Sequence, residues 1–316
     1  MLGGVLEIAA RVTTRREEAE DVVVLELSRL DGGALPRWSP GAHIDVLLAP
    51  TLERQYSLCG DPDRDEWQIA VLRERAGRGG SALMHQLRPG DEVSVRGPRN
   101  HFELVDAASY LFIAGGIGIT PLVPMIEQLD RRGQHGWELV YGGRHHASMA
   151  FVDRLGHHGS RVTLWPEDQR GLLELDRLLR PPRRDTVVYC CGPEALIAAV
   201  EECCAIWPAD ALHVERFHPR PQRDLTPSSA FEVHLEDSGI TVTVPAGQTI
   251  VEALEAAGIR VATSCREGTC GTCETEVLEG VPDHRDAYLT PEERASGETM
   301  LICCSRSRTP RLVLGL

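Results

Sequence analysis

The chain of 316 residues lacks lysine, so all 33 of its basic residues are arginine, and its formal net charge is −14. We draw no function from the preference for arginine. The deficit of positive charge argues against nucleic acid as a partner, because phosphate binding needs a basic face. The missing lysine also bears on His284-Arg285-Asp286, which looks like a kinase catalytic triplet. Since no glycine loop with a following lysine strand exists in the chain, we interpret this triplet as a structural turn.

Apolar runs long enough to cross a bilayer are also missing, and the N-terminus lacks the basic-then-apolar pattern of a signal peptide. We therefore expect a cytoplasmic protein without a membrane partner. The chain has ten cysteines, which in a secreted protein would suggest disulfides. In a reducing compartment, clustered cysteines more often ligate metal.

The pattern of strands, helices and turns divides the chain into three expected domains. Residues 1–102 hold short β-rich runs between turn signals, which predicts an antiparallel β-barrel. Residues 103–223 alternate strands and helices, as in a doubly wound α/β domain with a parallel sheet. Residues 224–316 complete the chain, and the stretch 218–229 reads as a stiff, proline-containing linker. Among the expected elements are strands at 21–27, 43–48, 110–114, 138–141, 186–190, 231–235 and 241–244, and helices at 122–129, 194–206 and 250–257.

Four cysteines in the last segment have the plant-type spacing for a [2Fe–2S] cluster: C-x4-C-x2-C, then a gap of 29 residues, then the fourth. The predicted metal ligands are Cys265, Cys270, Cys273 and Cys303. Small residues in the first loop let backbone amides curl around the cluster sulfides. Cys304 directly follows the fourth cysteine, so the spacing alone does not separate these two candidates. A cluster of this kind carries one electron at a time, which predicts an electron carrier.

Two stretches of the first segment are candidates for a phosphate-binding site. Arg54-Gln55-Tyr56-Ser57 ends a barrel strand. About twenty residues later, a strand with Val71 and Arg73 runs into a glycine loop, Gly79-Gly80-Ser81, that opens an expected helix. Backbone amides at such a helix start, with a serine hydroxyl, make a phosphate cradle.

The R-x-Y-S stretch resembles the flavin motif of the ferredoxin–NAD(P) reductase superfamily. The resemblance implies that Arg54 neutralises the flavin phosphate, that Tyr56 packs by the ring system, and that Ser57 hydrogen-bonds near flavin N5. The G-R-G-G-S form of the loop is similar to that of the subgroup that binds FMN rather than FAD.

The second segment carries two nicotinamide motifs. Gly116, Gly118, Thr120 and Pro121 belong to a G-x-G-x-T-P turn between a strand and a helix, where glycines let the backbone approach a pyrophosphate. The second motif, Cys191-Gly192-Pro193, follows a later strand.

In the resembling superfamily, that cysteine lies close to the reactive nicotinamide carbon, so Thr120 and Cys191 join Ser57 as catalytic candidates. Arg144, after another strand, is a candidate for the adenosine half and could contact the 2′-phosphate of NADPH. The resemblance also places an aromatic residue against the flavin, and Phe217 is the candidate for this position and the fourth catalytic candidate.

The order of the motifs along the chain resembles the phthalate dioxygenase reductase family. That resemblance implies FMN, NADH and [2Fe–2S] as cofactors, a C-terminal α+β ferredoxin domain of the β-grasp type, and electron transfer from NADH to a terminal oxygenase. In this family the partner is usually a Rieske-type enzyme that hydroxylates or demethylates aromatic compounds. A cytochrome P450 or a separate ferredoxin as acceptor is one alternative, and a non-enzymatic redox sensor is another.

Overall fold

The structure is a computed structural model that describes residues 7–49, 52–75, 77, 79–218 and 229–316. It contains two compact units, Met1–Glu215 and Arg216–Leu316. Most of the predicted linker, residues 219–228, lies outside the described residues. The predicted boundaries between three domains stay a prediction.

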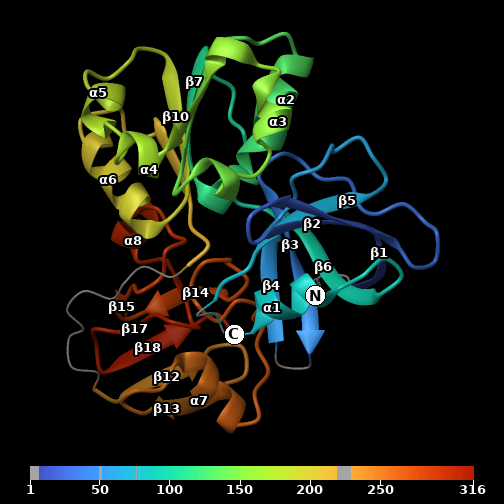
Figure 1. The fold of residues 1–316 in the computed structure, drawn as a ribbon. Coiled ribbons are helices and arrows are strands. Elements are labelled where there is room, and N and C mark those ends of the chain that lie inside the picture. The colour runs from blue at the N-terminus through green and yellow to red at the C-terminus, as the bar shows by residue number, and fades with distance from the viewer. Residues whose placement is uncertain (1–6, 50–51, 76, 78, 219–228) are drawn as a thin grey trace. The chain divides into compact units, whose positions relative to one another are not determined.

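The first unit opens with a six-stranded antiparallel sheet in the order β4-β3-β6-β1-β2-β5 (Figure 1). Its edges approach each other, because Leu58 forms a bridge with Ile69 and the Cys59 amide donates to the Gln68 carbonyl over 2.9 Å. The sheet therefore curls into the expected barrel. Its elements are β1 (Glu7–Ala19), β2 (Val22–Arg29), β3 (Ala42–Ala49), β4 (Leu52–Ser57), β5 (Trp67–Leu72), helix α1 (Gly80–Gln86) and β6 (Glu92–Asn100).

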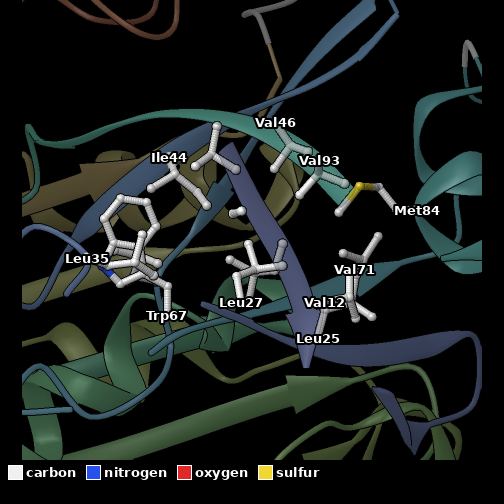
Figure 2. Close-up of a cluster of buried hydrophobic side chains, with 14 of the residues drawn as sticks. Val12, Leu25, Leu27, Leu35, Ile44, Val46, Trp67, Val71, Met84 and Val93 are labelled. Carbon is white, nitrogen blue, oxygen red and sulfur yellow. The ribbon is translucent and has the colours of Figure 1, made fainter. Parts of the chain in front are cut away.

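Alternating apolar residues of these strands fill the barrel core, as Figure 2 shows. Leu25 and Leu27 of β2 and Ile44 and Val46 of β3 belong to this cluster, together with Trp67 of β5. This period-two burial is what a pleated strand with one core face requires. The barrel is thereby a stable frame for the residues at its strand ends.

The rest of the first unit is a parallel five-stranded sheet in the order β11-β10-β7-β8-β9. The helices α2 and α3 lie on one face of this sheet and α5 and α6 on the other (Figure 1). The chain runs outward from β7 to β9 and then returns to β10, so β7 and β10 are neighbours at a topological switch point, where open α/β sheets bind ligands. The strands are β7 (Ser109–Gly115), β8 (Trp137–Gly143), β9 (Val162–Pro166), β10 (Thr186–Cys191) and β11 (Leu212–Glu215), and the helices are α2 (Leu122–Arg131), α3 (Val152–Gly156), α4 (Glu167–Arg170), α5 (Leu175–Leu179) and α6 (Glu194–Cys204), with short 3-10 turns η1 (Gly116–Ile119), η2 (His146–Ser148) and η3 (Gly159–Arg161).

The second unit is a mixed sheet in the order β13-β12-β18-β14-β16 with a helix packed on it. Helix α7 begins at a capping box in which Thr249 and Glu252 satisfy each other's backbone amides. The elements are β12 (Phe231–Leu235), β13 (Ile240–Val244), α7 (Ile250–Ala256), β14 (Glu274–Glu279), β15 (Pro282–Asp283), α8 (Pro291–Ser296), β16 (Thr299–Leu301), β17 (Arg306–Ser307) and β18 (Arg311–Leu314). The predicted fold class is confirmed for all three parts. In the described part of the chain, the helices are too short or too polar to cross a membrane.

Candidate functional site

The flavin motif and the glycine loop come together at one edge of the barrel. Arg54 lies on β4, and Gly80 begins α1. A Cβ atom on Gly80 would lie 2.7 Å from Cγ and Nε of Arg54, so the arginine stem runs directly over this glycine. Gly79 has a φ of 86°, which glycine adopts without strain. The structure thus brings the predicted phosphate-binding arginine to the predicted phosphate cradle.

Three other predicted flavin-site residues, Ser81, Val71 and Arg73, differ in exposure and in their contacts. Ser81 accepts a hydrogen bond from the Glu74 amide over 3.0 Å and so closes the loop before the helix. Val71 is 1% exposed and its side chain belongs to the barrel core, which leaves only its backbone for a cofactor. Arg73 is exposed. These roles stay predictions.

Within the motif, strand pairing separates the side chains of Gln55 and Tyr56. Gln55 donates to buried Asp45 over 3.0 Å and is thereby turned towards the neighbouring strand β3. Tyr56 is half-buried and packs against the barrel core, and this burial raises the pKa of its phenol. Tyr56 is therefore a neutral aromatic surface, suitable for packing by a flavin ring.

The two nicotinamide motifs meet at the switch point. Gly118 packs against the backbone of Cys191 and Gly192: a Cβ atom on Gly118 would clash with the Cys191 carbonyl and lie 2.6 Å from the Gly192 amide nitrogen. Glycine at 118 is thus required by close backbone approach. The hydroxyl of Thr120 is buried and donates to the Ile117 carbonyl over 2.9 Å, which holds the turn before Pro121 and α2.

Arg144 directly follows β8 and is exposed. Gly142 of β8 pairs with Gly115 of β7, so Arg144 lies at the same carboxyl edge of the sheet as the first nicotinamide motif. That edge is where the adenosine half of a dinucleotide is expected.

Glu215 is a site residue that the sequence reasoning missed. It ends β11 beside Cys191, and its Oε2 accepts from the Ser57 hydroxyl over 3.5 Å and lies 4.0 Å from the Cys191 thiol. Ser57 is 5% and Cys191 0% exposed, so the carboxyl group sits among buried groups. The available signal was an acidic residue at the end of a strand, two positions before Phe217.

Burial decides the protonation of this group. It raises the pKa of Glu215 to about 8, against a smaller lowering by the Ser57 hydrogen bond. Burial first, and then the nearby Glu215, raises the pKa of Cys191 well above its usual value, so Cys191 is a thiol rather than a thiolate. The site therefore holds a carboxylic acid that can keep or release a proton near neutral pH.

This raised pKa predicts a pH dependence of stability. The folded protein keeps a proton on Glu215 that the unfolded chain has lost, so the free energy of unfolding should fall as pH rises from about 4.5 towards about 8. Glu215→Gln should flatten this part of the profile, measured as melting temperature against pH. Glu167→Gln, at an exposed site, is the control and should keep the wild-type slope. A slope unchanged by Glu215→Gln would contradict the raised pKa of Glu215.

Phe217 lies in the second unit, is partly exposed, and its role stays a prediction. The same unit brings the four predicted cluster ligands together. The Cys265 thiol lies close enough to the thiols of Cys270 and Cys303 to interact with both. The Cys303 thiol also interacts with Cys273.

The loop that carries three of these thiols is shaped by left-handed residues. Arg266, Gly268 and Gly271 have φ values of 56°, 73° and 72°. Across the described ranges, no group of three or more His, Cys, Asp or Glu side chains is arranged for a single metal ion. A two-iron cluster instead takes four thiolates in total, which is the donor set that this loop and Cys303 offer.

The Cys304 thiol lies against Gly268 of the three-cysteine loop and interacts with the Cys303 thiol, but it also has other partners. It lies 3.8 Å from the Leu301 carbonyl and 3.9 Å from the Ser305 hydroxyl. Cys303 is 3% exposed. The neighbouring thiols thus support Cys303 as the fourth ligand, which stays a prediction.

Comparisons with known proteins agree with a [2Fe–2S] domain in the second unit and with a reductase over the whole chain. A family model described as a 2Fe-2S iron-sulfur cluster binding domain matches residues 233–308. The phenoxybenzoate dioxygenase subunit beta of Ectopseudomonas oleovorans is 41% identical over 98% of this chain and 97% of its own length.

Two solved structures are similar over 98% of this chain. Phthalate dioxygenase reductase has a TM-score of 0.72, 34% identity and 98% of its own chain covered. An intact type IV self-sufficient cytochrome P450 monooxygenase has a TM-score of 0.90 and 47% identity, but this chain spans only 41% of it. The chain therefore belongs to the phthalate dioxygenase reductase family. It is an electron-transfer reductase of the kind found in oxygenase systems, and it uses NAD, a flavin and a [2Fe–2S] cluster.

Proposed function

We propose that the ends of β4 and β10 form the place where a nicotinamide passes electrons to a flavin. One observation carries this proposal: the Glu215 carboxyl group contacts Ser57 of the flavin motif and Cys191 of the nicotinamide motif. The two motifs therefore face a common point. Proximity of two stacked rings supplies the rate of such a transfer, and no general base is required.

The residues at this point shape the approach of the rings. When the Ser57 hydroxyl does not donate to Glu215, it can donate to an atom of the flavin ring. The Cys191 thiol is neutral, so it presents an uncharged surface to the rings. Gly192 carries no side chain and therefore leaves room for a ring. A Cβ atom added to Gly115 would lie 3.4 Å from the Cα of Gly192, so the backbones of the two glycines are close together. Buried groups on both sides exclude water from the transfer.

We propose FMN as the flavin and NADH as the donor. Arg54 beside Gly80 would neutralise a single terminal phosphate, and the short G-R-G-G-S loop is similar to that of the FMN-binding subgroup. A bound flavin converts a two-electron donor into single electrons, which a [2Fe–2S] cluster can carry one at a time. Arg144 is the residue that would contact a 2′-phosphate if NADPH were the donor.

Arg54 gives a direct test of the flavin site. Arg54→Gln should weaken flavin binding by roughly 10- to 100-fold, because a charge-assisted bond to phosphate contributes about 1.5–3 kcal/mol. The measurement is flavin dissociation followed by fluorescence of the released flavin. Arg64→Gln, at an exposed arginine, should bind flavin like the wild type. Equal flavin affinity of both variants would remove Arg54 from the site.

The electron acceptor of this chain is an oxygenase, and we propose a Rieske-type aromatic hydroxylase or demethylase. A cytochrome P450 is the second candidate, because the P450-containing structure is 47% identical to this chain and the phthalate dioxygenase reductase 34%. A non-enzymatic sensor is not supported, since the relatives are reductases and oxygenase components. The cytoplasmic location stays a prediction.

An anaerobic NADH titration followed by visible absorption tests the scheme. We expect bleaching of both the flavin and the cluster bands, with the released flavin identified by its mass as FMN. Reduction of a purified Rieske oxygenase and a purified P450 by catalytic protein with NADH then separates the two acceptors. A cluster band that stays oxidised would rule out internal transfer, and exclusive reduction of the P450 would replace the Rieske proposal.

A further inference from the structure

The His284-Arg285-Asp286 turn packs directly on the loop that carries three of the cluster thiols. The Ala287 amide donates to the Gly268 carbonyl over 2.8 Å. A Cβ atom on Gly268 would lie 3.0 Å from Cα of Asp286, and one on Gly271 would lie 2.7 Å from the Tyr288 hydroxyl oxygen. The turn and the loop are therefore in contact at both glycines, and at Gly268 the Cys304 thiol also fills the space that a side chain would need.

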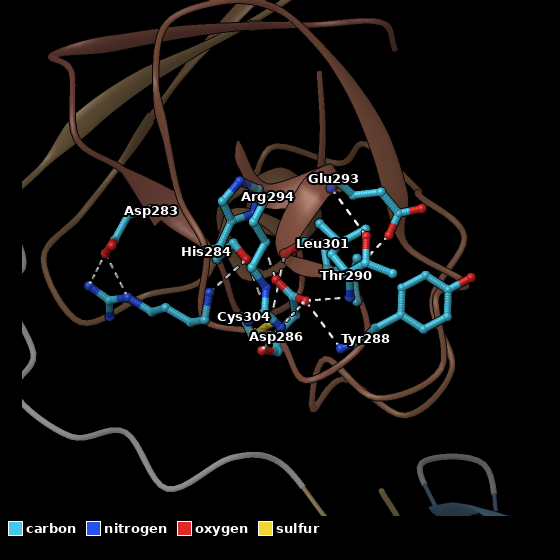
Figure 3. Close-up of polar contacts among 12 residues, drawn as sticks. Asp283, His284, Asp286, Tyr288, Thr290, Glu293, Arg294, Leu301 and Cys304 are labelled. Atoms are coloured by element: carbon cyan, nitrogen blue, oxygen red, sulfur yellow. Dashed lines mark hydrogen bonds and ion pairs between the residues drawn. The ribbon is translucent and has the colours of Figure 1, made fainter. Parts of the chain in front are cut away.

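The carboxylate of Asp286 organises this turn, as Figure 3 shows. Its side chain is 0% exposed, and its Oδ2 accepts from the backbone amides of Tyr288 and Leu289 over 3.1 and 2.8 Å. Arg294 of α8 donates to the same oxygen over 3.2 Å and to the Asp286 carbonyl over 3.0 Å. A buried charge persists when it is paired and hydrogen-bonded in this way.

The same turn also reaches the segment that follows the fourth cysteine. The Arg285 amide donates to the Ser305 hydroxyl over 3.2 Å, and β15 pairs with β17 immediately beyond it. One short stretch thus connects the three-cysteine loop with the strand region after Cys303. A change in the turn would therefore alter the surroundings of both the three-cysteine loop and Cys303.

We propose that Asp286 is a positioning residue for the [2Fe–2S] cluster, which holds the Ala287 amide on Gly268 and the Tyr288 ring over Gly271. The carboxylate would thereby hold the backbone of the three-cysteine loop in place, and the Tyr288 ring would limit the access of water to this loop. Hydrogen bonds to the sulfurs and solvent exposure both set the reduction potential of such clusters. This inference rests on the proposed ligand set of four cysteines.

The test compares three variants of the whole flavin-loaded protein. Asp286→Asn weakens the charged bonds to two amides and Arg294, and Tyr288→Ala removes the ring but leaves the carboxylate network. Asp237→Asn, at an exposed carboxylate of the same unit, controls for the loss of one negative charge. The readouts are the cluster reduction potential, from an EPR-monitored titration, and hydrogen exchange of the amides at 266–273.

Reduction adds negative charge to the cluster, so entry of water should favour the reduced form. For Asp286→Asn and Tyr288→Ala we expect the ratio of reduced to oxidised cluster at fixed potential to rise about tenfold, a shift of about 59 mV for one electron. Amide exchange in the loop should be faster in Asp286→Asn. Asp237→Asn should match the wild type in both readouts.

Potentials and exchange rates equal to those of Asp237→Asn would overturn the inference and leave Asp286 as a fold-stabilising residue only. If Asp286→Asn assembles no cluster, the test rests on Tyr288→Ala. An unchanged cluster reduction potential in Tyr288→Ala would then overturn the proposal. A wild-type protein without a [2Fe–2S] EPR signal would overturn the ligand set as well. A normal wild-type signal with unchanged variants would overturn this inference alone.

Discussion

Cys303→Ala should abolish electron delivery to protein acceptors and leave NADH–ferricyanide activity close to that of the wild type. Alanine offers no ligand atom, and the Cys303 thiol lies against Cys265 and Cys273 in the second unit. Three of the residues that we expect to act in the reduction of the flavin by NADH, Ser57, Thr120 and Cys191, belong to the first unit. The measurements are iron and sulfide content, the EPR signal, and the two activities.

The adjacent cysteine provides a matched control. Cys304→Ala should keep the cluster, because its thiol packs on the backbone of Gly268 and lies near the Leu301 carbonyl and the Ser305 hydroxyl, and we do not expect it to be a ligand. The opposite pattern, with the cluster lost in Cys304→Ala and kept in Cys303→Ala, would reverse the ligand assignment. Loss of ferricyanide activity together with acceptor reduction in Cys303→Ala would mean that the second unit supports the flavin site.

Gly118→Ala should impair the entry of electrons and therefore lower both activities together. A methyl group at this position would meet the backbone of Cys191 and Gly192, and backbone atoms cannot move aside by a rotamer change. Overpacking of this kind costs about 1–3 kcal/mol, so kcat/KM for NADH should fall by roughly 10- to 100-fold. Stopped-flow measurement of flavin reduction by NADH checks this directly.

Gly156→Ala in α3 is the control for this substitution, since a Cβ atom there meets no heavy atom within 4 Å. It should reduce flavin at the wild-type rate. Wild-type rates in flavin-loaded Gly118→Ala would mean that the contact between the two nicotinamide motifs is irrelevant to NADH binding. Loss of flavin from the variant would show that the damage extends into the barrel.

The elements that the sequence predicted well are those with a strong local pattern. The strand expected at 231–235 is β12, and the helix expected at 250–257 is α7 with bounds Ile250–Ala256. Period-two alternation and the Thr249–Glu252 capping box are properties of neighbouring residues, so they can be read without the fold. The last strands of the second unit are short, with three residues in β16 and two in β17, and carry no comparable pattern.

The candidate site divides in the same way. The cysteine spacing and the two glycine motifs are contiguous or nearly so, and their chemistry is visible in the residues themselves. Val71 belongs to the same kind of stretch, yet its side chain lies in the barrel core. Which way a strand residue points depends on register, and a shift by one residue reverses it.

By itself the sequence determined the cofactor classes, the order of the motifs and the alternation of strands and helices, because each depends on residues close together in the chain. Only the tertiary structure decided that Glu215 meets Ser57, 158 positions away, and that the Asp286 turn packs on Gly268 and Gly271. The nearby thiols of Cys265 and Cys273 also support the choice of Cys303 over Cys304 that the sequence had already predicted. Such contacts depend on strand order and on the packing of distant segments, which no local pattern encodes.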